Sequence, residues 1–256
     1  MPSIAELRAV VQPPSVIERT SGEHWSGPLY MRRISPYLTR VLLRTPLSAT
    51  AVTWLMIPVG LLGALALTLP GVWWAVVAVL LIQLVQLLDC CDGEIARWRQ
   101  TFSPAGVYLD RIAHHTATAA LPAALGVRAD GGWDSLGGWT TVGLGVSVLA
   151  LLIMAETSLV IVARAEAGLP LLPDTVAVAA PRGGVLRQAR RALRFLPFFR
   201  VLVPIEATFL ALAAAIVDAA TDSLDGSRVL LLFLVAAAAI TAVGHLVGIM
   251  ASQRLR

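Results

Sequence analysis

Long apolar runs separated by short polar stretches dominate the pattern along this 256-residue chain. A helix of about 20 apolar residues crosses roughly 30 Å of hydrocarbon, and windows of that kind recur along the whole chain. The candidate spans are residues 48–69, 72–95, 104–125, 139–163, 201–220 and 229–252. Because a helix satisfies its own backbone hydrogen bonds inside lipid, the pattern predicts an all-α, polytopic membrane protein with six transmembrane helices.

The composition supports a membrane location and orients the chain. Hydrophobic residues make up 57% of the sequence and charged residues only 14%, whereas soluble domains carry about 25% charged residues. Every basic residue is an arginine, and six spans with an internal amino terminus place all of them except Arg128 and Arg228 on one side. The positive-inside rule then predicts a multi-pass protein of the cell membrane with both termini in the cytoplasm.

The amino-terminal part differs from the rest because it is polar, contains prolines and is rich in arginine. It shows no pattern of a cleavable signal peptide. We therefore expect a cytoplasmic N-terminal segment at residues 1–45, followed by a six-helix membrane domain at residues 46–256.

Residues 28–44 within that segment form a candidate interfacial amphipathic helix. Apolar side chains repeat there at helical spacing, at Tyr30, Ile34, Tyr37 or Leu38, and Val41. A basic helix of this kind before a span usually lies on the inner leaflet, and Pro36 is a candidate kink. The alternative is that the helix contributes to the roof of an active site.

A second basic segment lies at residues 182–200, with arginines at Arg187, Arg190, Arg191 and Arg194. We expect these arginines either to face anionic headgroups or to contact a phosphorylated acceptor. Arginine-rich segments also occur in nucleic-acid-binding proteins, but among so many predicted spans we expect no nucleic acid partner.

Acidic and histidine side chains interrupt the second and third spans at helical spacing. Positions separated by three, four or seven residues share one helix face, as do Asp89, Asp92, Gly93 and Ala96. The next span has the same property, with i, i+4 neighbours at Gly106, Asp110 and His114. Ser103 and Pro104 predict the N-cap and first turn of that helix. The two spans form a hairpin, so both polar faces can converge at its cytoplasmic end.

Three carboxylates that converge near a membrane boundary repel one another unless a cation lies between them. Mg²⁺ takes carboxylate oxygens together with substrate phosphates, and Arg97 adds a planar fork suited to phosphate. Gly93, Ala96 and Gly106 remove side-chain bulk and leave room for a ligand. The alternatives are a polar contact between helices and a transporter site, but a transporter would carry acids at mid-depth and inverted repeats.

The combined spacing resembles a known family signature. Asp89-x-x-Asp92-Gly93-x-x-Ala96-Arg97 is followed, after eight intervening residues, by Gly106-x-x-x-Asp110-x-x-x-His114. This resembles the pattern D-x-x-D-G-x-x-A-R-x8-G-x-x-x-D-x-x-x-D of the CDP-alcohol phosphotransferases at every fixed position except the last. The resemblance implies six spans, a homodimer, and transfer of a substituted phosphate from a CDP-linked donor to an acceptor hydroxyl with release of CMP.

Two other stretches are similar to particular branches of that family. "CDGEIAR" and "RRISPYLTRVLLRTPLSATAVT" are similar to the di-myo-inositol phosphate phosphate synthases. "VARAEAGLP" is similar to the end of the fourth span in phosphatidylinositol-phosphate synthases and phosphatidylglycerophosphate synthases. These similarities imply a polar acceptor, with a phosphorylated polyol as one candidate, and a donor such as CDP-diacylglycerol or a CDP-polyol.

By position, the resemblance assigns metal binding to Asp89, Asp92 and Asp110, with Mg²⁺ as the expected ion and Mn²⁺ as the alternative. It assigns the cytidine diphosphate pocket to four further residues, Gly93, Ala96, Arg97 and Gly106.

The departure from the family pattern falls at His114, where the signature has an aspartate that completes the metal site and acts as the base. We expect Asp110 and His114 to be the catalytic pair, with His114 as general base or metal ligand. Two alternatives stay open: the base comes from His115 or a water, or the protein binds a CDP-ligand without turnover.

A second departure lies at the start of the first span, where related enzymes often carry T-P-N-x-x-T. Here the sequence is Ser48-Ala49-Thr50-Ala51-Val52-Thr53. The hydroxyls of Ser48, Thr50 and Thr53 are candidate nucleotide contacts, but the asparagine is missing. Glu156 and Glu206 are further acids inside predicted spans, each expected to pair with an arginine such as Arg164 or to line a polar chamber.

Overall fold

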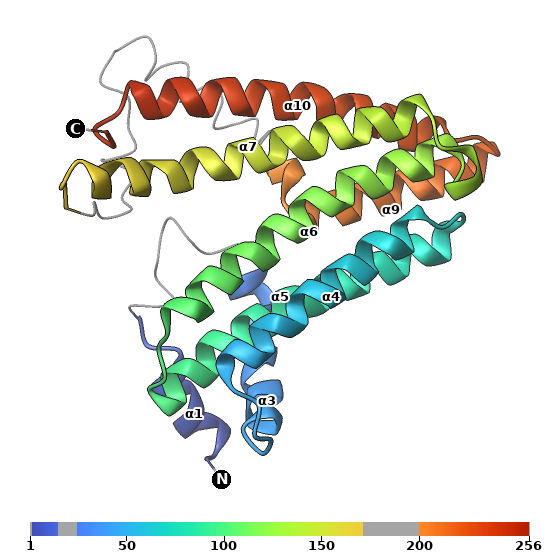
Figure 1. The fold of residues 1–256 in the computed structure, drawn as a ribbon. Helices are drawn as coiled ribbons and strands as arrows, with labels where there is room; N and C mark the ends of the chain where they lie inside the picture. The colour runs from blue at the N-terminus through green and yellow to red at the C-terminus, as the bar shows by residue number, and fades with distance from the viewer. Residues whose placement is uncertain (1, 15–24, 171–199, 256) are drawn as a thin grey trace. The chain divides into compact units, whose positions relative to one another are not determined.

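The computed structural model describes residues 2–14, 25–170 and 200–255, and within these ranges every regular element is helical (Figure 1). The elements before the first long helix are α1 (Ile4–Val11), the π-helical turn η1 (Gly27–Met31) and α3 (Arg32–Leu42). The long helices are α4 (Ala49–Thr68), α5 (Val72–Arg99), α6 (Pro104–Asp130), α7 (Gly138–Glu166), α9 (Pro204–Thr221) and α10 (Asp225–Met250). Two short 3-10 turns, η2 (Trp133–Ser135) and η3 (Arg200–Leu202), precede α7 and α9. The predicted all-α class is confirmed for the described residues.

Each predicted span corresponds to one of the long helices. Five of them are long and apolar enough to cross a membrane, namely α4, α5, α7, α9 and α10. The helix α6 is of similar length, but its polar side chains include Asp110, Arg111 and His114. The membrane-helix character of the chain is therefore confirmed, whereas the sixth span stays a prediction.

The chain divides into two compact units. The first comprises Met1–Gly63 and Ala78–Ala117, and the second comprises Ala64–Val77 and Thr118–Arg256. Both halves of the sequence motif lie in the first unit. The sequence predicts a different boundary, between residues 45 and 46, where a cytoplasmic segment would end and a membrane domain would begin. That boundary stays a prediction.

The first unit has an apolar core shared by α4, α5 and α6. Its buried members are Val52, Met56, Val85, Leu88, Cys91, Ile95 and Ala113. In a lipid environment such helices associate through close van der Waals packing and polar contacts, since lipid is as apolar as the core itself. This packing brings the polar positions of α4, α5 and α6 within reach of one another.

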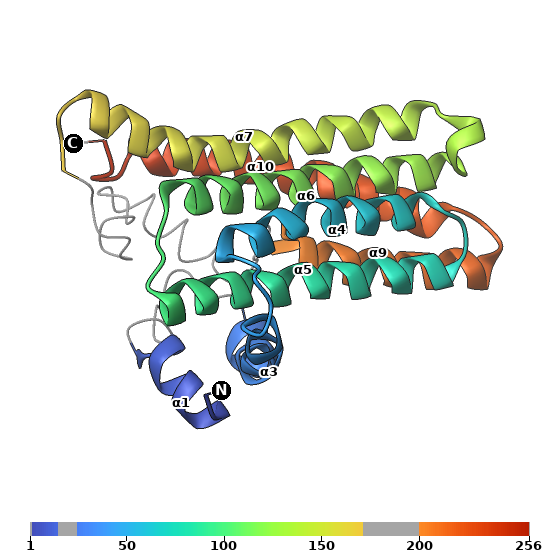
Figure 2. The ribbon, with the colours of Figure 1, turned by 60° about the horizontal axis from the view of Figure 1, so that its bottom comes forward.

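Helix α3 buries polar side chains and exposes apolar ones. Ser35 and Thr39 are buried, whereas Ile34, Tyr37 and Val41 are exposed. Figure 2 shows α1 and α3 beside the carboxyl-terminal part of α5. A helix in water would have the opposite arrangement, so this outer face suits an apolar environment.

The second unit packs α6 against α7 through glycines. A Cβ atom added to Gly143 would lie 2.5 Å from the Pro122 carbonyl oxygen, and one added to Gly126 would lie 2.6 Å from that of Trp139. Such contacts are typical of small-residue packing between membrane helices. The basic segment predicted at 182–200 lies outside the described residues, apart from Arg200.

Glu156, which was expected to pair with an arginine or to line a polar chamber, pairs with a histidine in this unit. The Glu156 carboxylate of α7 is buried and lies 3.0 Å from His245 Nδ1 of α10. Arg164 donates to the carbonyl oxygens of Pro170 and Arg254. The sequence did not indicate His245 because its partner is distant along the chain.

Candidate active site

A short turn joins the two halves of the motif. Helix α5 ends at Arg99, α6 begins at Pro104, and the Ser103 hydroxyl accepts a hydrogen bond of 3.0 Å from the Gly106 amide. Gln100 adopts a left-handed conformation with φ of 54°, and the Thr101 amide donates to the Ala96 carbonyl at 3.0 Å. The predicted N-cap is therefore confirmed, and the turn sets the polar faces of α5 and α6 opposite each other.

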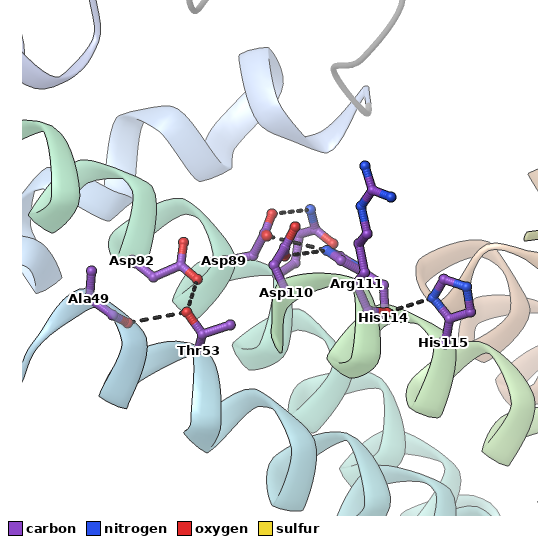
Figure 3. Close-up of polar contacts among 9 residues, drawn as sticks. Ala49, Thr53, Asp89, Asp92, Asp110, Arg111, His114 and His115 are labelled. Atoms are coloured by element: carbon purple, nitrogen blue, oxygen red, sulfur yellow. Dashed lines mark hydrogen bonds and ion pairs between the residues drawn. The ribbon is translucent and has the colours of Figure 1, made fainter. Parts of the chain in front are cut away.

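Asp89 of α5 and Asp110 and His114 of α6 form a group that we call the acid–histidine cluster (Figure 3). His114 Nε2 lies 3.2 Å from Asp89 Oδ1 and 3.3 Å from Asp110 Oδ1. One oxygen of each carboxylate and one imidazole nitrogen lie within 4.8 Å of one another. All three side chains are partly exposed, so solutes can reach them.

The chemistry of this cluster suits a cation. Asp110 Oδ1 is buried and accepts no well-aligned hydrogen bond from the described residues. Ionised carboxylates are acceptors only, and a neutral imidazole has a lone pair on one of its nitrogens. Acceptors that converge in this way require either a proton or a metal ion between them. Two carboxylates and an imidazole are common ligands of divalent metals, so the residues present fit such an ion.

Asp92 is held apart from the cluster. Its carboxylate is 9% exposed, and its Oδ2 atom accepts a hydrogen bond of 2.6 Å from the Thr53 hydroxyl of α4 (Figure 3). The Thr53 hydroxyl also lies 3.1 Å from the Ala49 carbonyl oxygen. The structure thus brings together Asp89, Asp110 and His114, while the metal role assigned to Asp92 stays a prediction.

His115, the alternative base considered from the sequence, is placed differently from His114. Its Nδ1 atom lies 2.5 Å from the Arg111 carbonyl oxygen, one turn earlier in α6. Figure 3 shows its ring pointing away from Asp89 and Asp110. Of the two adjacent histidines, only His114 contacts the acids.

A cavity of about 490 Å³ lies beside the cluster, within the range of about 300–1,000 Å³ that is usual for ligand pockets. Of the residues proposed from the sequence, it is lined by Thr50, Thr53, Asp89, Asp92, Gly93, Ala96, Gly106 and Asp110. The turn and the first residues of α6 add lining residues that the motif did not indicate, Thr101, Phe102, Ser103, Pro104 and Val107. For the first four, the available signal was their position between the two motif halves, whereas Val107 follows Gly106 within the second half.

Three proposed residues do not line this cavity, namely Ser48, Arg97 and His114. The Ser48 hydroxyl accepts a hydrogen bond of 3.1 Å from the Ala51 amide, so this serine caps the start of α4. The nucleotide contact proposed for Ser48 stays a prediction.

The Arg97 guanidinium lies against Gly93. A Cβ atom added to Gly93 would lie 3.1 Å from Arg97 Nη1 and 3.2 Å from Nη2. Arg97 Nε donates a hydrogen bond of 2.6 Å to the Val11 carbonyl oxygen, at the end of α1. The missing side chain at Gly93 thus makes room for a neighbouring arginine, which the motif alone did not indicate.

Comparison with known protein families gives one match. Residues 43–180, more than half of the chain, match the family described as CDP-alcohol phosphatidyltransferase. A comparison with curated proteins finds no match. The matched range contains both halves of the motif and the cavity lining, but it begins after α1, η1 and α3. The chain therefore belongs to the CDP-alcohol phosphatidyltransferase family.

Proposed function

We propose that the protein is a metal-dependent transferase that moves a substituted phosphate from a CDP-linked alcohol to an acceptor hydroxyl and releases CMP. Family membership supports a CDP-alcohol donor, an alcohol acceptor and phosphotransferase chemistry. The observation that carries the proposal is the acid–histidine cluster beside a cavity large enough for a nucleotide.

The residues of the cluster have two tasks in this proposal. Asp89, Asp110 and His114 would hold a divalent ion, with Mg²⁺ as the expected ion and Mn²⁺ favoured by the imidazole ligand. When bound, such an ion would offset the charge of the donor diphosphate and of the departing CMP. Asp92 and Thr53 lie on the same cavity wall, where they would orient the donor.

We also assign to His114 the task of receiving the proton of the acceptor hydroxyl. A neutral imidazole takes a proton near pH 7 more readily than an ordinary carboxylate does. The acceptor oxygen attacks the phosphorus that carries the donor alcohol, and the bond from that phosphorus to the CMP oxygen breaks. A group that holds the ion cannot use the same lone pair as a base, so metal dependence and pH dependence separate the two roles.

A second candidate function is binding of a CDP-ligand without turnover. Only the histidine at position 114 favours it, because the family signature has an aspartate there. Both candidates use the same cavity, so nucleotide binding does not separate them, whereas turnover does.

We also propose the membrane arrangement that the resemblance and the arginine pattern imply. It comprises six spans with α6 as the third, cytoplasmic termini, a homodimer, and α3 lying on the inner leaflet of the cell membrane. The exposed Ile34, Tyr37 and Val41 side chains of α3 support contact with lipid.

The function is tested with the purified full chain in detergent or lipid vesicles. CDP-diacylglycerol and CDP-polyols are offered as donors with a panel of alcohols that includes phosphorylated polyols, and CMP release is measured with Mg²⁺, with Mn²⁺ and with a chelator. We expect release that requires the donor, the acceptor and the ion. Metal-dependent CDP binding without CMP release for any pair would contradict the transferase and support the second candidate.

A further inference from the structure

Helix α1 is attached to the motif-bearing part of α5 by contacts between residues far apart in the sequence. Gln12 Nε2 donates a hydrogen bond of 2.8 Å to Glu94 Oε1, and the Val11 carbonyl accepts one of 2.6 Å from Arg97 Nε. Glu94 and Arg97 lie within the motif, whereas Val11 and Gln12 lie outside the range that matches the family. The end of the amino-terminal helix therefore contacts residues of the motif directly.

Glu94 is the centre of this attachment. Its side chain is 0% exposed, and its carboxylate also accepts hydrogen bonds from Ser35 Oγ at 2.5 Å and Thr39 Oγ1 at 2.7 Å. We call Glu94 with Gln12, Ser35 and Thr39 the Glu94 junction. A buried carboxylate is stable only when hydrogen bonds or charges satisfy it, and here α1 and α3 supply the donors. The junction thus joins three segments at one fully enclosed group.

Gln12 connects the end of α1 to α3 as well as to Glu94. Its Nε2 atom also donates to the Arg32 carbonyl oxygen at 2.9 Å. Arg8, one turn earlier in α1, donates to the Arg33 carbonyl oxygen at 2.9 Å and lies 5.9 Å from the ring centroid of Tyr37. These contacts fix the position of the end of α1 relative to α3.

The end of α1 also contacts Arg97. A guanidinium is planar, so a hydrogen bond from Nε to the Val11 carbonyl restricts the plane in which Nη1 and Nη2 lie. Both terminal nitrogens lie beside Gly93, which lines the cavity. A movement of α1 would remove this acceptor for Nε.

We propose that α1 is a component of the donor site, in which Gln12 and Glu94 are positioning residues that orient Arg97 toward the donor diphosphate. The inference rests on the proposed function for the identity of the donor. Its physical basis is separate, since it depends on the attachment of α1 to α5. Gln12, Glu94 and Arg97 do not line the cavity themselves. The Arg97 terminal nitrogens lie beside a lining residue, Gly93, so the two positioning residues act through Arg97.

The test exchanges the two partners of the Gln12–Glu94 hydrogen bond in the full chain. Gln12→Glu places two carboxylates together and releases α1. Glu94→Gln in that background restores an amide opposite a carboxylate, so the double variant recovers part of the attachment. The matched control is Gln253→Glu, which makes the same chemical change at an exposed position in the second unit.

Two measurements are made on each variant. Amide hydrogen exchange over residues 7–12 reports whether α1 is attached, independently of any activity. Donor KM, kcat and the equilibrium affinity for CDP report the state of the site. For Gln12→Glu we expect faster exchange, a donor KM and a CDP dissociation constant raised roughly tenfold, and a kcat changed by less than about threefold. The double variant should regain most of the CDP affinity, and Gln253→Glu should match the wild type.

The outcomes separate this inference from the proposed function. Faster exchange in Gln12→Glu with unchanged CDP affinity would overturn the inference, as would exchange that does not change at all. A fall in kcat at constant donor KM and constant CDP affinity would also contradict it. Absence of turnover in the wild type would contradict the proposed function alone, because the CDP affinities of the variants still decide the role of α1.

Discussion

Glu94 and Asp89 are acids on the same helix, yet their surroundings are opposite. The Glu94 carboxylate is fully enclosed and accepts hydrogen bonds from Gln12, Ser35 and Thr39. The Asp89 carboxylate is partly exposed and faces Asp110 across the His114 nitrogen. The first acid is satisfied by neutral donors from its own chain, whereas the second lies among other acceptors.

Under the proposed function, this difference separates an acid that stabilises the fold from acids that bind a ligand. Removing a satisfied acid leaves donors unpaired in an apolar interior, so the cost appears in stability. Removing one of several facing acids relieves repulsion, so the cost appears in binding and catalysis. Four substitutions test this separation.

The largest effect is expected for Asp89→Asn. The amide keeps the size of the side chain but removes the charge that the acid–histidine cluster offers to a divalent ion. We expect CMP release to fall by about a thousandfold or more, with weaker metal-dependent CDP binding and an unchanged or slightly higher unfolding temperature. Asp134→Asn, at an exposed position of η2, is the control. Activity of Asp89→Asn near the wild-type level would refute the metal assignment.

The converse substitution is Glu94→Leu, which should lower stability by about 1–3 kcal/mol because the donors of the Glu94 junction lose their acceptor. The shift in the thermal unfolding midpoint in detergent measures it, with the exposed Glu166→Leu as control. If Glu94→Leu unfolds at the wild-type temperature, Glu94 does not stabilise the fold.

Thr53→Val tests Asp92, which is buried like Glu94 but lines the cavity like Asp89. The substitution preserves shape and removes the hydroxyl that donates to Asp92 Oδ2. The expected result is a loss of roughly tenfold in kcat/KM, the equivalent of one charge-assisted hydrogen bond, with little change in stability. Thr221→Val, at the exposed end of α9, provides the comparison. An unaltered kcat/KM would show that Asp92 needs no orientation by Thr53.

The smallest change in rate is expected for His114→Asp, which restores the family pattern. If the imidazole serves as a ligand, the carboxylate replaces it, and activity should stay within about tenfold while the preference moves from Mn²⁺ toward Mg²⁺. Rates measured across a series of Mg²⁺ and Mn²⁺ concentrations report this shift. A dead His114→Asp variant with intact CDP binding would mean that the histidine has a chemical role that a carboxylate cannot fill.

Much of the fold and of the site was predictable because it depends on short-range spacing. The 3.6-residue period places Asp89 and Asp92 on one face of α5, and Asp110 and His114 on one face of α6. Ser103 followed by Pro104 marked the start of α6 correctly. The expectation that the two polar faces meet was confirmed for Asp89, Asp110 and His114, because a turn of a few residues leaves little freedom to a hairpin.

Other predictions failed or stayed open where they depended on contacts distant in sequence. The partner of Glu156 is His245, on a helix near the other end of the chain. Arg97 contacts Val11, and Gly93 makes room for that arginine. A short turn forces its two flanking helices together, but residues dozens of positions apart are under no such constraint. Helical periodicity therefore cannot indicate which of these distant residues meet.

Local periodicity and composition are enough to predict the helical class, the apolar segments and the residues on each polar face. The different surroundings of the three acids of α5, in contrast, arise from helix packing. Asp89 faces Asp110 and His114, Asp92 pairs with Thr53, and Glu94 is enclosed by α1 and α3. The physical reason is that the role of a carboxylate depends on the donors, acceptors and solvent around it, and helix packing supplies these from distant parts of the chain.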